Sequence, residues 1–353
     1  MLPVVVFVLA AAVFAQGTSE FMLSGLLPSI AADCGVSVGT AGLLTSLFAV
    51  GMVLGAPAMT AIPISRRPAL IGFLLLFSAS HVVGALTVDF GVLLGTRAVA
   101  AVANAGFLAV ALASLPSLAP PALVGRATSV ILAGVTVACI VGVPAGTVLG
   151  QYLGWHATFW AVAAITAACA LFPLRVKDSP RDSVVDEWRS VRCFRLILVG
   201  VLVNAATFAG FTYLGVFAAG FGGVWVPVAL ALFGLGSFAG VTAAGRGLVR
   251  FGPAVLVVVW LAALLASASL PGLLIAAFAC GACSFGVGAT LIGAIVRTAS
   301  AAAPNIAGAL ATTAFNVGAV AGPALAGLAV SQAFLVSAGF ALVAAVVRPR
   351  GTW

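Results

Sequence analysis

Long apolar runs, separated by short polar breaks, fill almost the whole chain. The runs are rich in Ala, Leu, Val and Gly and extend for roughly 20 residues, the length that an α-helix needs to cross about 30 Å of hydrocarbon. A transmembrane β-barrel would instead alternate polar and apolar residues over segments of about 10. The pattern predicts an all-α membrane protein with about twelve transmembrane helices. The predicted spans are residues 3–30, 39–62, 68–88, 91–115, 127–149, 157–174, 196–220, 225–245, 253–271, 273–296, 305–330 and 333–347.

Composition and charge agree with this pattern. Hydrophobic residues make up 63% of the chain, charged residues only 6%, and the mean hydropathy is +1.30. Apart from Arg97, every Lys and Arg falls in a connection after an even-numbered span or at the chain's end. Since short cytoplasmic loops collect basic residues, we expect a multi-pass protein of the inner (plasma) membrane with both termini in the cytoplasm. The net charge of +8 then reflects orientation, and no nucleic-acid partner is expected.

Three local features have plain interpretations. Residues 1–16 could be a cleaved signal peptide, but they lack a basic start, so a retained first helix is expected. Cys280 and Cys283 share a helix face and are expected to be small packing residues rather than a metal or redox site. The last span, 333–347, is short for a crossing, so we expect a truncated last helix.

A polar stretch from Lys177 to Arg195 divides the chain into two blocks of six spans. We therefore predict a first half at 1–175, a cytoplasmic linker at 176–195 and a second half at 196–353. Four residues of the second span recur in the eighth at a constant spacing, which indicates that the halves are related repeats, as in many transporters. The matching positions are Leu47, Phe48, Gly51 and Gly55 with Leu232, Phe233, Gly236 and Gly240.

Several motifs carry a family resemblance. The first span contains Gly-Thr-Ser-Glu-Phe at 17–21 and Gly-Leu-Leu-Pro-Ser-Ile-Ala-Ala-Asp at 25–33, and the fifth contains Gly142, Pro144, Gly146 and Gly150. Gly-Trp-His-Ala-Thr-Phe-Trp follows at 154–160, with Asn-Ala-Gly-Phe-Leu at 104–108 and Ala-Phe-Asn-Val-Gly at 314–318. The chain resembles the major facilitator superfamily, in particular its drug:proton antiporters with twelve spans, and among these actinobacterial chloramphenicol exporters.

This resemblance implies two pseudo-symmetric six-helix halves and proton-coupled efflux of small amphipathic drugs by alternating access. Chloramphenicol or a related phenicol would be the substrate, and protons and the lipid bilayer the other partners of a monomer. The resemblance also makes the four residues of the fifth span an antiporter motif. Family members, however, usually carry an acidic residue in the loop after the second span, and here no acid lies between Asp33 and Asp89. Export of sugars or other small metabolites, and a shortened inactive remnant, therefore stay open as alternatives.

Glu20 and Arg97 are the only formally charged residues inside the predicted spans. Each costs about 2.5 to 3.5 kcal/mol at a helix centre, so each implies a partner or a function. At 1.5 Å per residue, Glu20 lies about 15 Å and Arg97 about 10 Å below the outer boundary, which allows the two to share a layer. They could form a structural ion pair, or they could couple transport to protons. In the related antiporters an acid of the first helix takes up the proton while the arginine of the fourth helix tunes it.

Polar residues at helical spacing are candidates for lining a substrate cavity. Gln16 precedes Glu20 by four residues and Asn104 follows Arg97 by seven, which places each on the face of its charged neighbour. The other candidates are Asn204, Thr207, Phe211 and Asn316. His81 is expected to be structural, because its span is peripheral in the resembling fold.

Other chemistry finds little support in the sequence. The P-loop needs Gly-Lys-Ser or Gly-Lys-Thr, whereas the single lysine, Lys177, follows Val176. The HExxH pattern of zinc proteases is absent from the sequence. We therefore predict a secondary transporter, not an enzyme, that uses no cofactor or metal.

Overall fold

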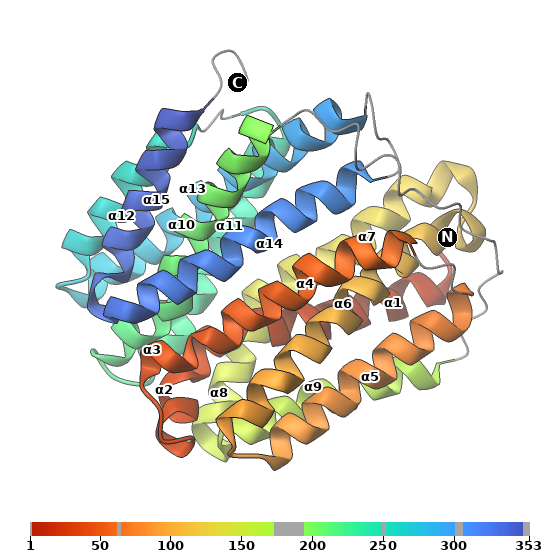
Figure 1. Ribbon diagram of the computed structural model, residues 1–353, viewed down its shortest axis with the longest axis horizontal. Coiled ribbons are helices and arrows are strands. Elements are labelled where there is room, and N and C mark those ends of the chain that lie inside the picture. The colour runs from red at the N-terminus through yellow and green to blue at the C-terminus, as the bar shows by residue number, and fades with distance from the viewer. Residues whose placement is uncertain (1, 62–64, 173–193, 249–251, 301–305, 349–353) are drawn as a thin grey trace.

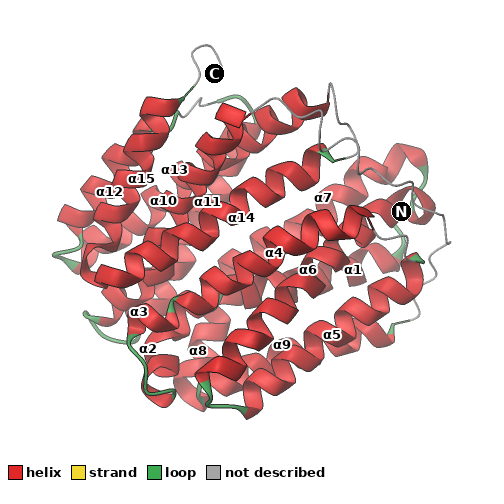
Figure 2. Cartoon of the chain, in the orientation of Figure 1, coloured by secondary structure: helices red, strands yellow, loops and turns green. Residues whose placement is uncertain are grey.

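Helices form every regular element in the part of the chain that the computed structural model describes, which is residues 2–61, 65–172, 194–248, 252–300 and 306–348 (Figure 2). The first helices are α1 Val4–Phe21, α2 Leu23–Asp33, α3 Val38–Ala41, α4 Leu43–Ala61, α5 Arg66–Leu86, α6 Phe90–Leu118, α7 Val124–Val137, α8 Val143–Leu153 and α9 Trp155–Leu171. The others are α10 Phe194–Ala219, α11 Trp225–Gly245, α12 Ala254–Ala266, α13 Leu270–Ser300, α14 Ala307–Ala326 and α15 Ala333–Val347. The prediction of an all-α protein is confirmed.

Nine helical stretches of the described residues are long and apolar enough to cross a membrane. One of them runs from Ala307 to Val347 through α14 and α15, and two further apolar helices, α9 and α12, are shorter than this limit. The predicted span 253–271 ends early, at Ala266, because a turn follows in which the Ser267 hydroxyl donates to the Leu264 carbonyl (2.7 Å). The chain is thus a multi-pass membrane protein.

The first predicted span is divided at Met22 into α1 and α2. Pro28 lies inside α2, where it has no N–H to offer the Ser24 carbonyl one turn before it. The backbone at Ser24 lies against Gly215 of α10, where any side chain would collide with the Ser24 carbonyl oxygen. The division therefore lets α2 pack closely on the second part of the chain.

Pro144 lies near the middle of the region predicted as the fifth span. A wide turn of π-helix, Ala138–Gly142, precedes this proline and separates α7 from α8. Such π turns open the regular ladder of hydrogen bonds and are frequent at functional sites. This turn lies against α11, because a side chain at Gly234 would collide with the Cys139 carbonyl.

The repeated glycines have equivalent structural roles. On α4, a side chain at Gly51 or Gly55 would crowd Ala101 or Ala105 of α6. On α11, a side chain at Gly236 or Gly240 would collide with backbone carbonyls of α13. Each glycine pair therefore allows one close helix contact, as small residues commonly do between membrane helices.

The two parts of the chain meet along α4 with α14, which run side by side in Figure 1. They also meet where α2 contacts α10 and α8 contacts α11. Hydrogen bonds also join them, since the hydroxyl of Ser46, near the start of α4, donates to the Val320 carbonyl of α14 (2.9 Å). The buried Tyr213 hydroxyl donates to the Pro323 carbonyl (3.0 Å). Around these contacts the two parts are closed against each other.

Candidate functional site

Arg97 on α6 is 1% exposed and is bound to α1. Its Nη1 donates to the Ser19 hydroxyl (2.7 Å) and its Nη2 to the Ser19 carbonyl (2.9 Å). The guanidinium carbon also lies 4.4 Å from the centroid of the Phe48 ring on α4, a cation–π contact. Arg97 is thus held by neighbours on two other helices, while its Nε is buried without a hydrogen-bond partner among the described residues.

His81 on α5 completes this cluster. Its Nε2 lies 2.6 Å from the Ser19 hydroxyl and 3.5 Å from Arg97 Nη1, and its Nδ1 lies 2.8 Å from the Phe77 carbonyl. The ring stacks on that of Phe77 (4.3 Å between centroids). His81 is thus fully buried in contact with Ser19 and Arg97, a position that the expectation of a peripheral, structural residue did not include.

Glu20 lies beside this cluster without joining it. Glu20 and Arg97 are close enough to interact electrostatically, yet no direct ion pair joins them within the described ranges. Of the two alternatives that the sequence left open, the direct ion pair is therefore not formed among the described residues. Because consecutive residues are 100° apart around a helix, α1 presents Ser19 to Arg97 and turns the partly exposed Glu20 away.

Two amides predicted to accompany the charges are buried. Gln16 is 1% exposed, and both polar atoms of its side chain lack hydrogen-bond partners among the described residues. Asn104 is buried on α6. An unpaired buried amide costs about 1 to 3 kcal/mol, which favours a role for Gln16 in another conformation or with a ligand.

A cavity of about 350 Å³ lies between α10, α11, α13 and α14. The predicted residues Asn204 and Thr207 both line it, and Asn204 Nδ2 donates to the Phe315 carbonyl (2.6 Å), which leaves its Oδ1 as an acceptor. Ser284, which no sequence motif or spacing indicated, also lines the cavity, and its buried hydroxyl has no hydrogen-bond partner among the described residues. The full lining is Asn204, Thr207, Val241, Ser284, Phe285, Gly288, Ala289, Ile292 and Phe315.

Two predicted lining residues lie elsewhere. Phe211 is buried in an aromatic cluster, 5.8 Å from Phe21 and 4.8 Å from Phe233 between ring centroids. Asn316 follows Phe315 on α14, but its Nδ2 donates to the Thr312 carbonyl of the same helix (3.0 Å). Helical spacing identified the polar positions, but it could not tell which of them faces the cavity.

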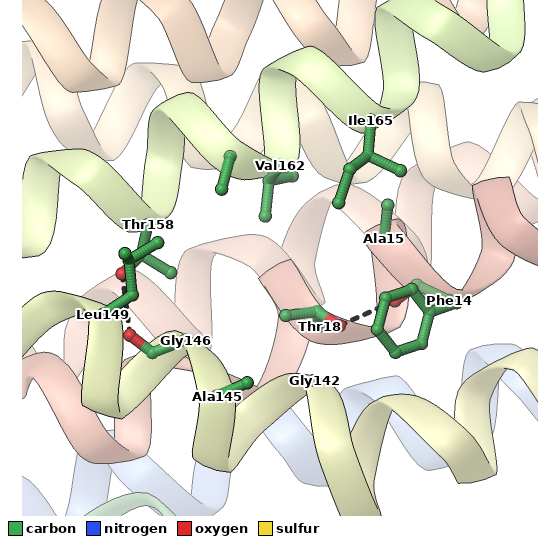
Figure 3. Close-up of a pocket in the computed structure, with 11 residues that line it drawn as sticks. Phe14, Ala15, Thr18, Gly142, Ala145, Gly146, Leu149, Thr158, Val162 and Ile165 are labelled. Carbon is green, nitrogen blue, oxygen red and sulfur yellow. Dashed lines mark hydrogen bonds between the residues drawn. The ribbon is translucent and has the colours of Figure 1, made fainter.

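An apolar groove of about 150 Å³ lies between α1, α8 and α9, beside the predicted antiporter motif (Figure 3). Gly142 and Gly146 line it, whereas Pro144 and Gly150 do not. The two hydroxyls at its wall are occupied, since Thr158 donates to the Gly146 carbonyl and Thr18 to the Phe14 carbonyl (both 2.8 Å). The motif therefore supplies close packing, because a side chain at Gly142 would collide with the Thr18 hydroxyl and one at Gly150 with Leu26.

Comparison with known proteins agrees with this architecture. The family model of the Major Facilitator Superfamily matches residues 9–271. A chloramphenicol resistance protein of Streptomyces lividans is 48% identical over 92% of this chain and 88% of its own. The inner membrane transport protein YdhP of Escherichia coli strain K12 is 30% identical, with the same shares covered.

Solved structures share the fold at low sequence identity. The nucleoside transporter NupG superposes with a TM-score of 0.79 at 14% identity, covering 97% of this chain and 98% of that one. A bacterial homologue of the human lysosomal transporter Spinster, in an inward-facing conformation, gives 0.73 at 18% identity, covering 98% and 96%.

Proposed function

The chain belongs to the Major Facilitator Superfamily and is a membrane transporter, not an enzyme, and on this premise we propose that it exports small amphipathic drugs in exchange for protons. Chloramphenicol or a related phenicol is the proposed substrate. The observation that carries this substrate is the 48% identity to a chloramphenicol resistance protein along most of both chains. The cavity of about 350 Å³ supports it, because sites for small molecules span about 300 to 1,000 Å³ and are mostly apolar with a few polar groups.

The proposed architecture has twelve spans in two related halves, 1–175 and 196–353, joined by the linker 176–195, of which residues 176–193 lie outside the described residues. The equivalent close contacts of α4 with α6 and of α11 with α13 support this division. Alternating access in such folds is a rocking of one half against the other. The contacts of Tyr213 and Ser46 would then close the outer end, and they would separate when the carrier opens outward.

Proton coupling is assigned to Glu20 and Arg97. A carboxylate in the membrane is costly, and Glu20 has no ion-pair partner in direct contact among the described residues, so proton uptake is its readiest route to neutrality. Arg97, bound close by, can change how readily Glu20 accepts that proton. Drug and proton would compete for the carrier, which acts as a monomer.

Expression in a host that lacks its own drug pumps tests the function. We expect raised tolerance to chloramphenicol and lower accumulation of the labelled drug. If the host is Escherichia coli, its own relative of this family should also be deleted. Unchanged tolerance and accumulation, despite confirmed membrane insertion, would favour the remnant. Unchanged tolerance together with measurable sugar export would favour the metabolite exporter.

Replacing two asparagines in turn tests whether the drug binds in the cavity. Asn204→Ala removes an acceptor from the cavity, and we expect chloramphenicol to bind about fivefold more weakly, the equivalent of one lost hydrogen bond of about 1 kcal/mol. Asn316→Ala is the matched control, because that amide is bonded within its own helix and does not line the cavity. Binding to both purified variants should be measured by equilibrium dialysis, and an equal loss in the two would contradict the assignment of the cavity.

Cysteine labelling tests the proposed orientation. Cys34 follows α2 on the proposed outer side, where burial raises the pKa of its thiol and the carboxylates of Asp33 and Asp89 raise it further. Because the thiolate is the reactive form, an impermeant maleimide should label Cys34 in intact cells, and faster at about pH 9 than at about pH 7. Cys34→Ser should lose this label, and Cys193, outside the described residues, should react only after permeabilisation. Labelling of Cys193 in intact cells would reverse the orientation.

A further inference from the structure

His81, Ser19 and Arg97 form a hydrogen-bonded chain whose direction follows from their chemistry. A guanidinium only donates, so the Ser19 hydroxyl accepts from Arg97 Nη1 (2.7 Å). The Phe77 carbonyl only accepts, so His81 Nδ1 carries a proton and donates to it (2.8 Å). Arg97 Nη1 also approaches His81 Nε2 (3.5 Å), which favours a lone pair there and makes Nε2 the acceptor of the Ser19 hydroxyl proton (2.6 Å).

This chain holds Arg97 in a position that leaves Glu20 without its cation. Ser19 is the residue before Glu20 on α1, and Arg97 binds both the hydroxyl and the carbonyl of Ser19. The guanidinium is nevertheless not saturated, because its Nε is buried without a hydrogen-bond partner among the described residues. Nε together with one Nη is a pair that can bind a carboxylate in bidentate fashion. If the Arg97 guanidinium were released from Ser19, it could therefore bind the Glu20 carboxylate through Nε and one Nη.

We propose that His81 is a positioning residue of the coupling site, which holds Arg97 on Ser19, and so away from Glu20, by accepting the hydrogen bond of the Ser19 hydroxyl. This inference rests on the proposed role of Glu20 in proton coupling. When the hydrogen bonds from Arg97 through Ser19 to His81 are intact, Glu20 lacks a direct ion pair and takes up a proton readily. When they are broken, Arg97 pairs with Glu20 and favours the ionised carboxylate.

The other groups around these residues are compatible with this role. Among the described residues, the ionisable side chains that interact with Glu20 are Arg97 of α6 and the Cys139 thiol of the π turn. Around His81, α9 contributes the Phe159 ring (5.5 Å between centroids) and α1 contributes Ser19. Arg97 is therefore the charged residue whose position His81 can influence.

Two amide replacements of His81 form a matched pair. Glutamine can place an acceptor near the position of Nε2 and should keep the bond to Ser19. Asparagine is shorter, reaches only the region of Nδ1 and should lose that bond. Ser19→Ala removes the middle of the chain while keeping the backbone bond to Arg97 Nη2.

The readout is the pH profile of chloramphenicol export by the full chain in proteoliposomes. For His81→Asn and Ser19→Ala we expect the profile to move to lower pH by about one unit, because an adjacent guanidinium favours the ionised carboxylate. His81→Gln should keep the profile of the unaltered protein. The double variant of His81→Asn with Ser19→Ala should move no further than either single change, because both break the same chain.

Glu20→Gln separates this inference from the proposed function. If Glu20→Gln retains the pH profile of the unaltered protein, Glu20 does not couple the proton, and the proposed coupling role of Glu20 fails together with this inference, while drug export itself stands. If Glu20→Gln flattens the profile but His81→Asn leaves it in place, coupling by Glu20 stands and the role of His81 is overturned. Equal shifts in His81→Gln and His81→Asn would also overturn it, since the acceptor at Nε2 would then not matter.

Discussion

Glu20→Gln is expected to abolish export driven by a proton gradient while leaving a folded protein that still binds drug. The amide keeps the shape and hydrogen-bonding capacity of the carboxyl group but cannot exchange a proton. In the structure Glu20 is partly exposed and forms no direct ion pair within the described ranges, so the replacement breaks no salt bridge, and Arg97 keeps its hydrogen bonds to Ser19. Flux of labelled chloramphenicol in proteoliposomes should fall to that of liposomes without protein.

The same experiment reports the charge that is carried. Exchange of one proton for one neutral drug moves one charge inward, so a potential of about 100 mV adds roughly 2.3 kcal/mol to export. Export by the unaltered protein should respond to membrane potential and to pH, and Glu20→Gln should respond to neither. Glu20→Asp, which retains a carboxyl group, is the matched control and should keep part of the activity. Full gradient-driven export by Glu20→Gln would remove Glu20 from the coupling mechanism.

Arg97→Ala is expected to destabilise the protein and to reduce its yield. Arg97 is fully buried, donates to both the hydroxyl and the carbonyl of Ser19, and lies over the Phe48 ring. Hydrogen bonds from a charged group contribute about 1.5 to 3 kcal/mol each, so the free energy of unfolding should fall by about 3 kcal/mol or more. Thermal unfolding of the purified protein in detergent measures this loss.

Two further variants are compared with Arg97→Ala to explain its change in stability. Arg97→Lys keeps the charge, but a single ammonium cannot reproduce the planar fork, so we expect intermediate stability. Arg297→Ala is the control, because this arginine is exposed in the last turn of α13 and its removal should change stability little. If Arg97→Ala unfolded at the temperature of the unaltered protein, the buried cluster would contribute little to stability.

Charge in the membrane was the most informative signal in the sequence. Because burying a charge among apolar helices is costly, a lone acid and a lone arginine predicted a site, and in the structure Arg97 binds Ser19, the residue before Glu20. The sequence did not determine whether Glu20 and Arg97 pair directly. Neighbouring side chains on a helix point 100° apart, and on α1 it is Ser19, not Glu20, that faces Arg97. His81 was visible as an ionisable residue in a span, but its contact with Ser19 and Arg97 depends on how α5 packs on α1 and α6.

For the candidate cavity, too, the sequence predicted some of the lining residues and the packing of the helices decided the others. Helical spacing identified Asn204, Thr207 and Asn316 as polar positions in membrane helices, and Asn204 and Thr207 line the cavity. Asn316 is bonded to its own helix, and Ser284, a small residue in a helix rich in small residues, gave no signal in the sequence.

The sequence by itself determined the fold class, the membrane location and the family, because hydrocarbon requires long apolar helices and because the motifs of the first and fifth spans are local. Helix rotation, the π turn before Pro144 and the partners of buried polar groups were decided only in the tertiary structure. Periodicity along one helix specifies which residues share a face. It does not specify what that face meets, because the meeting side chains come from segments distant in the chain and are selected by the packing of all the helices together.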